Sequence, residues 1–430
     1  MNELGLALET QGGSSGQTLA GAVSTGTHGG DKSMPPLADS VLAIHLVGAG
    51  GIQYWIEPSR GITDPRLLQR HVVPDIDRQN IVYDDATFDA CLVSLGCMRV
   101  IYAVVLRACQ RYDLVEKTVA TSWQAFKESA STHLRDPDNR FLQVLLNPYK
   151  DDNNDNFCLL TKRSEADFTG PKERSDRTLS LLGAVGSMLA NVIVRKPGTL
   201  FKLYHNDVFD GVFSGTSNEE KMAKIIDGIL TYAPDQRDVM VEHYENILRT
   251  QWPTGSFRGS SFSVMDLGYG HDIPSSQPGY SIELHFQAID ASGRLGFVEF
   301  VDSAIATVNA ATETFFAGYV SLRFTGSTRA SIGMQQWDPT CTVEISVLQG
   351  VQGLCELLAK LFRIGFNLGG LPHWGQLLDL DVQGHGSFYS QYALWRQVYA
   401  KMSNDFTART FENELSSRWE LTSPDQGETH

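Results

Sequence analysis

The chain has 430 residues, of which 42% are hydrophobic and 20% are charged. These values are typical of globular proteins and exclude a disordered or fibrous protein. The 35 basic and 50 acidic side chains give a formal net charge of −15. Such a surface repels phosphate groups, so we expect no binding to nucleic acid or to an anionic membrane. The length predicts two or three domains.

The cysteines and the N-terminal residues indicate the cellular compartment in which the protein occurs. The cysteines have no CxxC spacing, which favours buried or incidental thiols in a reducing environment. The first fifteen residues contain neither a basic nor an apolar leader region, and no apolar run is long enough to span a bilayer. We therefore expect a cytoplasmic protein without a membrane span. The cysteines are Cys91, Cys97, Cys109, Cys158, Cys341 and Cys355.

The first third of the chain is rich in glycine and in strand-forming residues. The β-branched run Val41–Val47, a glycine-rich turn at 48–51 and the run Ile52–Ile56 predict a hairpin. A helix is predicted from Asp84 to Leu95, because acidic residues open it and Gly96 follows it. The apolar run from Arg99 to Ala108 then predicts a buried strand.

The remaining elements alternate between strands and helices. Periodicity predicts an antiparallel sheet covered by helices on one face, and hence an α+β fold. The predicted strands are Arg140–Leu146, Asn156–Lys162, Ser281–Ala288, Gly318–Phe324 and Cys341–Leu348. The predicted helices are Thr178–Val194, Asn218–Ala233, a segment within Phe297–Phe316, Gly350–Phe366 and Tyr392–Met402.

The most informative motif is TLAGAVSTGTHGG, from Thr18 to Gly30. Glycine, serine and threonine expose backbone N–H groups and let a flat or phosphorylated ligand approach the main chain, although such a run by composition alone is more often a turn. The whole string resembles the second flavin-contacting loop of the vanillyl-alcohol-oxidase (PCMH-type FAD) superfamily. It is most similar to that loop in the alditol oxidases and the aldonolactone (gulonolactone, arabinonolactone) oxidases.

A second segment, FDACLVSLGCMRVIYAVVL from Phe88 to Leu106, resembles the family's next flavin-contacting stretch, with Gly96 in the turn. Ser94 and Arg99 stand where the family has glycine. Because an arginine is large at a position where the backbone approaches a ligand, the local geometry is expected to differ.

A third segment, Pro372–Gln376 (PHWGQ), resembles the RPHWGK string with which the family's chain returns to the reactive face of the flavin. Leu371 replaces the family's arginine, and Gln376 replaces a lysine with a catalytic or substrate-polarising role. An amide dipole therefore stands where the family has a point charge.

The three segments occur in the family order, so the resemblance implies the family's domain organisation. Residues 1–118 would form the second half of a PCMH-type FAD-binding domain, and residues 119–366 a substrate or cap domain. Residues 367–430 would return to line the flavin site. The FAD-contacting residues implied are Ala22, Ser24, Thr25, Gly26, Thr27, His28, Gly29, Gly96, Val100 and Ile101.

In the family a complete subdomain precedes the first motif; it wraps the FAD pyrophosphate and in some members carries the histidine bonded to the flavin. Here 17 residues precede the motif. Three interpretations stay open: the missing half lies on a second polypeptide, the chain is truncated, or the protein has abandoned FAD. If this chain alone binds FAD, we expect the binding to be non-covalent.

Four residues are candidates for catalysis: Glu283, Arg323, His373 and Gln376. Glu283 and Arg323 each alternate with apolar neighbours on a predicted strand, so they lie either on a solvent-facing side or, if buried, against each other or a substrate. His373 either faces the substrate or belongs to a packed seam with Trp374.

Metal ligands are not evident in the sequence. Asp379, Asp381 and His385 lie in one loop without a metal-binding spacing, and the acidic residues of loop 151–155 lack the glycine and terminal glutamate of a calcium loop. We expect no metal site.

The resemblance implies an FAD-dependent oxidoreductase that takes a hydride from a CH–OH group of a sugar alcohol, an aldonolactone or a related small hydroxylated substrate, with oxygen or another electron acceptor. Two alternatives remain: a cofactor-free descendant with a non-redox or binding role, and one subunit of a split flavoenzyme. An exposed apolar edge near residues 1–60 would favour a partner polypeptide.

Overall fold

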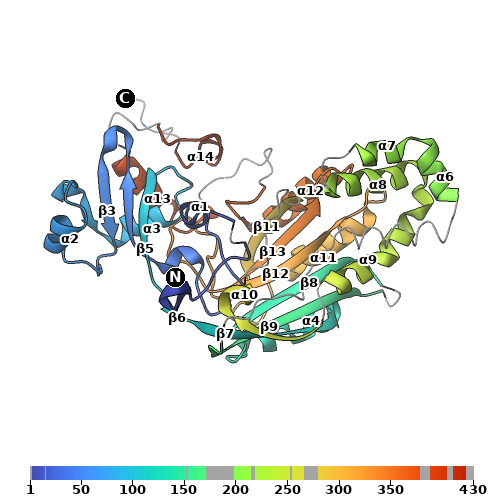
Figure 1. Cartoon of the computed structure of the whole chain (residues 1–430), viewed down its shortest axis with the longest axis horizontal. Helices are drawn as coiled ribbons and strands as arrows, with labels where there is room; N and C mark the ends of the chain where they lie inside the picture. Colours follow the sequence, from blue (N-terminus) through green and yellow to red (C-terminus); the bar gives the residue numbers. More distant parts are fainter. Residues whose placement is uncertain are drawn as a thin grey trace.

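The computed structural model describes residues 2–14, 16–151, 154–170, 198–214, 218–251, 254–265, 279–377, 388–403 and 410–422. A four-stranded sheet lies toward one end of the molecule and an eight-stranded sheet toward the other (Figure 1). Helices and antiparallel sheets combine as expected, so the predicted α+β class is confirmed. The predicted helix Thr178–Val194 lies outside the described residues.

The smaller sheet has the strand order β4-β3-β2-β5. The predicted hairpin is confirmed, because β2 and β3 pair antiparallel around the glycine-rich turn. Its strands are β2 (Val41–Val47), β3 (Gln53–Glu57), β4 (Ile81–Tyr83) and β5 (Val100–Leu106). Helices α1 (Leu19–Ser24), α2 (Pro65–His71) and α3 (Asp85–Leu92) belong to this part of the chain, and β1 (Leu6–Ala7) pairs with β6 (Cys109–Gln110).

Two details of this region differ from the prediction. Strand β5 is not buried: it is an edge strand, and Val100 and Tyr102 are 57% and 73% exposed. A continuous apolar run does not reveal whether a second neighbour covers it. Helix α3 ends at Leu92 rather than Leu95, because Val93 leaves the helical conformation with φ −107° and ψ 88°. Leu95 and Gly96 then adopt positive φ angles of 53° and 75°.

The larger sheet is antiparallel throughout, with the order β10-β7-β9-β8-β12-β13-β11-β14. All five strands predicted after residue 119 belong to it. Strands far apart in the chain become neighbours, since β8 pairs with β12. The strands are β7 (Tyr112–Ser122), β8 (Phe141–Lys150), β9 (Asn156–Asp167), β10 (Gly255–Ser260), β11 (Gly279–Gln287), β12 (Gly318–Thr325), β13 (Thr340–Leu348) and β14 (Leu371–Pro372).

Helices pack against this sheet, and others lie beyond one end of it (Figure 1). Helix α4 contacts β7 to β9, α11 contacts β8, and α12 contacts β11, while α6, α7 and α8 contact one another. The helices that follow β7 in the chain are α4 (Trp123–Arg135), α6 (Gly198–His205), α7 (Val208–Phe213), α8 (Asn218–Tyr232), α9 (Arg237–Gln251), α10 (Ser261–Met265), α11 (Val298–Ala310), α12 (Leu354–Asn367), α13 (Tyr392–Met402) and α14 (Glu414–Arg418). Of these, α13 contacts α3 in the region of the smaller sheet. Short 3-10 turns occur at Asn2–Leu4, Leu37–Ser40, Ala49–Gly51, Arg78–Asn80 and Pro234–Gln236.

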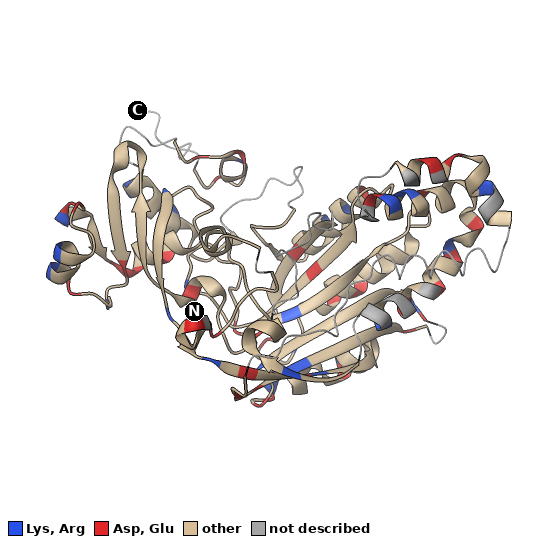
Figure 2. Ribbon diagram, viewed as in Figure 1, with Lys and Arg blue, Asp and Glu red and all other residues tan. Residues whose placement is uncertain are grey.

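Charged residues mark the outer helices, but they also interrupt the strands of the larger sheet (Figure 2). Glu283 on β11 is buried among core residues such as Ile282 and Leu284. All six cysteines are free, and four of them are buried. Among the helices that the structure describes, none is long and apolar enough to cross a bilayer.

Candidate active site

The glycine-rich motif folds into α1 and the turn that follows it. The side chain of Thr18 caps α1 by accepting a hydrogen bond from Gly21 N. The chain then turns at Gly26, whose φ of 75° favours glycine, and Thr27 N donates to Ala22 O at 2.9 Å. A Cβ on Gly26 would lie 2.7 Å from Cε of Met334, so this turn packs too closely for a side chain.

The three motif segments meet in space. Leu95 N, in the turn before Gly96, donates to Ser24 O at 3.2 Å. A Cβ on Gly375, in the C-terminal segment, would lie 3.1 Å from Oγ1 of Thr25. The convergence implied by the resemblance is therefore present in the structure.

The residues expected to contact FAD form a partly open edge. Gly96 is exposed, and a Cβ there would meet nothing within 4 Å. Gly375 is also exposed. Such small positions would let a flat ring approach the backbone. Among the others, Ser24, Thr25, Thr27 and Ile101 are half-buried, Ala22, Gly26, His28 and Gly29 are buried, and Val100 is exposed.

Arg99 shows how the chain accommodates its departure from the family. Its φ of 143° lies in the region that favours glycine, as expected for a position where the family has one. The side chain turns away from the motif loop: its guanidinium lies over the Tyr54 ring, 4.6 Å from the centroid, and donates to Met402 O. The Arg99 side chain therefore contacts Tyr54 of the smaller sheet and the end of α13 at Met402.

Glu283 is the centre of a buried polar cluster. Its Oε1 atom contacts Nε2 of His28 and lies 3.4 Å from Nε2 of His285, while Oε2 lies 3.4 Å from a terminal nitrogen of Arg323. The Glu283 and His28 side chains are each only 2% exposed. Burial alone would raise the pKa of Glu283, but the charge of His28 and its hydrogen bond hold that pKa well below the usual range.

The register of the neighbouring strands explains how Glu344 and Arg323 join the cluster. Glu283 on β11 pairs directly with Glu344 on β13, so their side chains share one face. Arg323 on β12 donates to Glu344 at 2.6 Å and also faces Glu283, so two carboxylates share one guanidinium. Burial raises the pKa of Glu344, and the charge on Glu283 adds to this against the effect of Arg323.

His373 joins the cluster from the segment after β14. Its backbone N donates to Glu283 O at 2.9 Å, and its ring centroid lies 5.6 Å from that of His28 and 5.7 Å from that of His285. Burial lowers the pKa of His373 to about 4, so its ring is neutral at pH 7. Burial likewise lowers the pKa of His285 well below the usual range.

The structure decides several of the alternatives. The strand face that carries Glu283 and Arg323 is not a solvent face: Glu283 is buried and the Arg323 side chain is only 15% exposed. Trp374, by contrast, packs into the seam, where its Nε1 donates to Ile332 O. Gln376 does not join the cluster: it is half-buried, and within the described residues no hydrogen bond links its side chain to Glu283 or the histidines.

Sequence reasoning missed three members of the cluster, namely His285, Glu344 and Gln335. His285 follows Glu283 by two residues on the same strand, so strand alternation could have placed it on the same face. Gln335 Nε2 lies 3.2 Å from His285 Nε2, but it comes from a connecting segment that has no periodic signal. Asp379, Asp381 and His385 lie outside the described residues.

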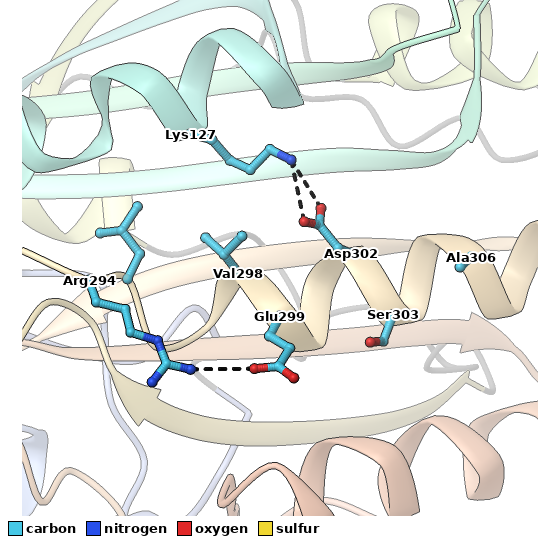
Figure 3. A pocket seen from close by; sticks show the side chains of 8 residues that line it. Lys127, Arg294, Val298, Glu299, Asp302, Ser303 and Ala306 are labelled. Atoms are coloured by element: carbon cyan, nitrogen blue, oxygen red, sulfur yellow. Dashed lines mark hydrogen bonds and ion pairs between the residues drawn. The ribbon is translucent and has the colours of Figure 1, made fainter.

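A separate hollow of about 730 Å³ lies beside α11 (Figure 3). Lys127 on α4 pairs with Asp302 at 3.3 Å, and Arg294 pairs with Glu299 at 3.4 Å. These charges are already paired with each other on an open surface. We therefore place the candidate active site at the buried cluster.

No protein-family model and no curated protein matches this sequence. Solved structures do match: a variant of the cholesterol oxidase from Brevibacterium sterolicum superposes with a TM-score of 0.60 at 11% identity, covering 97% of this chain and 78% of that one. The chain has the fold of the cholesterol oxidases. A second structure of that enzyme (TM-score 0.58, 10% identity, 97% and 78% covered) agrees. So does a solvent-stable cholesterol oxidase (0.56, 13%, 98% and 79%).

At these identities the comparison shows the fold of the chain, and membership of the superfamily that the three motifs resemble stays a prediction. The motif segments and the buried cluster lie within a chain of which 97% or more superposes on these enzymes. The roles of the individual site residues and the division at residues 118 and 366 stay predictions.

Proposed function

We propose that this protein is an FAD-dependent oxidoreductase that oxidises a CH–OH group of a sugar alcohol, an aldonolactone or a related small hydroxylated compound. The observation that carries the proposal is the buried cluster of Glu283, Arg323, His28 and His373 next to the place where the three motif segments meet. Burying charged side chains costs free energy, and buried charges with perturbed pKa values cluster at functional sites.

The residues present fit the ring of a flavin. The exposed position Gly96, where a Cβ would meet nothing within 4 Å, leaves room for a flat group, and the half-buried hydroxyls of Thr25 and Thr27 would face it. The bound flavin would supply the hydride acceptor, and the protein would supply orientation and electrostatics. We propose that FAD is bound non-covalently by these residues.

The cluster also offers unsatisfied polar atoms to a substrate. Arg323 Nε and Gln335 Oε1 are buried and have no hydrogen-bond partner within the described residues. A hydroxyl group both donates and accepts hydrogen bonds, so it would match one donor and one acceptor of this kind. Glu283 is ionised because its pKa is lowered, so its carboxylate would accept a hydrogen bond from the substrate hydroxyl. The hydroxyl proton would pass to a side chain or to water as the hydride leaves, and the neutral ring of His373 would help to orient the substrate.

A second candidate function is that of one subunit in a split flavoenzyme. Near the first motif, Leu4, Leu19 and Ile52 are 76%, 39% and 38% exposed, and the edge strand β5 exposes Val100 and Tyr102. Apolar side chains on an unpaired strand edge favour a partner polypeptide, which would supply further FAD contacts.

In either case, oxygen or another electron acceptor would reoxidise the flavin. We expect the reaction to take place in the cytoplasm.

The test is the absorbance spectrum and intact mass of the purified protein, followed by titration with FAD. We expect flavin absorbance or saturable FAD binding, an unmodified chain mass, and at least about tenfold weaker binding in Gly375→Leu, because the added side chain would occupy the exposed position where the ring would approach the backbone. Gly198→Leu is the matched control, because a Cβ at Gly198 meets nothing within 4 Å. A chain that binds no FAD, alone or with a co-purified partner, would support the cofactor-free alternative and contradict the proposal.

A further inference from the structure

The connection between β12 and β13 is buried although it forms neither a helix nor a strand. It spans residues 326–339, and residues 330–335 within it are all buried. Backbone groups that are buried outside regular structure need other partners, so a segment of this kind is fixed by what it contacts. We call residues 326–339 the strap, because they contact α3, the motif loop (residues 18–30) and the buried cluster.

Arg329 holds one end of the strap on α3. Its Nε atom donates to Oδ1 of Asp89, and a terminal nitrogen lies 3.4 Å from Oδ1 of Asp85. The guanidinium also lies over the ring of Phe88, 5.0 Å from the centroid. Ser331 N donates to the backbone oxygen of Asp89 at 3.1 Å, so side-chain and main-chain bonds join the strap to the same helix.

The carboxylates around Arg329 outnumber its positive charge. Asp39, in a 3-10 turn before β2, accepts a hydrogen bond from Arg329 N at 2.8 Å, so it joins Asp85 and Asp89 at this end of the strap. Burial raises the pKa of Asp89, and the carboxylates of Asp85 and Asp39 add to this against the effect of Arg329. Arg107 is a further positive charge, and it acts on Asp39. The Arg329 guanidinium is the positive charge that bonds directly to Asp85 and Asp89, and without it these like charges would repel each other.

The other end of the strap contacts both parts of the candidate active site. Met334 packs against the motif loop, where a Cβ on Gly26 would lie 2.7 Å from Met334 Cε. Gln335 is fully buried, and its Nε2 donates at 3.2 Å to Nε2 of His285, the ring nitrogen that keeps a lone pair because Nδ1 donates to a backbone carbonyl. Met334 and Gln335 follow Arg329 by five and six residues of mostly buried chain, so a shift of the strap on α3 would move both side chains.

We propose that Arg329 is a positioning residue for the candidate active site. Its guanidinium keeps the strap on α3, and the strap in turn holds Met334 against the motif loop and Gln335 against His285. Arg329 itself does not belong to the buried cluster, since its side chain is 37% exposed. The sequence did not indicate this role, because an irregular connection has no periodicity and the two acidic partners on α3 lie 240 and 244 positions away in the chain. The importance of the strap for FAD rests on the proposed function.

Hydrogen exchange followed by mass spectrometry, on the full chain without ligand, measures how firmly the strap and the motif loop are held. In Arg329→Gln we expect the amides of both segments to exchange at least about fivefold faster than in wild type, which is the effect of the stronger ion pairs among partly exposed ones. Arg294→Gln is the matched control, because it removes the same charge from a pair with Glu299 in which both side chains are exposed. The control should leave both segments unchanged.

A double variant separates the charge of Arg329 from its shape. Arg329→Gln with Asp89→Asn removes one positive and one negative charge, so its strap should exchange more slowly than that of Arg329→Gln alone. The amides of β13, which lies between β12 and β11, should exchange as in wild type, which shows that each variant is folded. If Arg329→Gln does not fold, Asp89→Asn alone takes its place and should speed the exchange of both segments.

Three results without ligand would overturn the proposal. Strap exchange in Arg329→Gln no faster than in Arg294→Gln would show that the charge does not hold the strap. Faster exchange of the strap with an unchanged motif loop would show that the strap does not position the site. Equal exchange in the single and the double variant would show that the charge of Arg329 is not what matters.

FAD is added in a separate measurement. If the protein binds FAD, exchange should slow in the motif loop and in the strap together, because coupling between two parts of a protein is reciprocal. Slower exchange in the motif loop alone would overturn the link between them. A protein that binds no FAD would contradict the proposed function, and the comparison without ligand would still decide the role of Arg329.

Discussion

Replacing Arg323 with methionine tests the charge arrangement of the buried cluster. The guanidinium lies 2.6 Å from a Glu344 oxygen and 3.4 Å from a Glu283 oxygen. With an effective dielectric constant of about 20, Coulomb's law gives attractions of roughly 6 and 5 kcal/mol. Removing the guanidinium also removes the cost of burying it, so the net loss is smaller than this sum.

Breaking a buried ion pair by removing one partner costs about 3–5 kcal/mol. Because the side chains of Arg323 and Glu344 are 15% and 14% exposed, we take the lower end, about 3 kcal/mol, for Arg323→Met. Glu344→Gln should cost less, about 1–2 kcal/mol, because it leaves Arg323 and Glu283 as a one-to-one pair and retains an amide oxygen as acceptor.

Thermal unfolding followed by near-UV circular dichroism measures the ranking. The midpoint should fall most in Arg323→Met, less in Glu344→Gln, and least in the control Arg294→Met, whose side chain is 72% exposed. If Glu344→Gln is as destabilising as Arg323→Met, or if Arg323→Met matches the surface control, the two carboxylates do not depend on the shared guanidinium and the reasoning is wrong.

Three further substitutions test the packing that supports the site. Gly26→Ala should destabilise the protein by about 1–2 kcal/mol, because φ is 75° and the new Cβ would meet Met334, and the thermal midpoint should fall. Tyr149→Phe should cost about 1–3 kcal/mol, because the buried Phe316 N–H loses its hydroxyl acceptor; an unchanged midpoint would contradict this. Lys127→Ala should change stability by less than about 1 kcal/mol, since its ion pair is exposed, and a larger loss would show that the hollow beside α11 is structural.

Sequence periodicity predicted the elements that build the site. The hairpin of the smaller sheet and the strands that carry Glu283 and Arg323 are where alternation places them. Strand β5 was wrongly expected to be buried, because an apolar run does not specify how many neighbours a strand has.

The composition of the cluster was only partly predictable. Glu283, Arg323, His28 and His373 were candidates, but the pairing of Glu283 with Glu344 depends on the register between β11 and β13, which pattern alone does not give. Gln376 was expected to join them because it stands in the place of a lysine, yet the described hydrogen bonds of Gln376 and Leu377 are backbone bonds, from Gln376 N to His373 O and from Leu377 N to Ser281 O.

The most direct test of the account is anaerobic mixing of the flavin-loaded protein with a panel of sugar alcohols, aldonolactones and simple alcohols, followed by visible absorbance. We predict that at least one polyhydroxylated compound bleaches the flavin, and that Glu283→Gln slows the bleaching by about 10²-fold or more, because the carboxylate that would position the substrate hydroxyl is lost. Flavin that no hydroxylated compound reduces, or bleaching at equal rates in wild type and Glu283→Gln, would contradict the assignment of this cluster as the site of CH–OH oxidation.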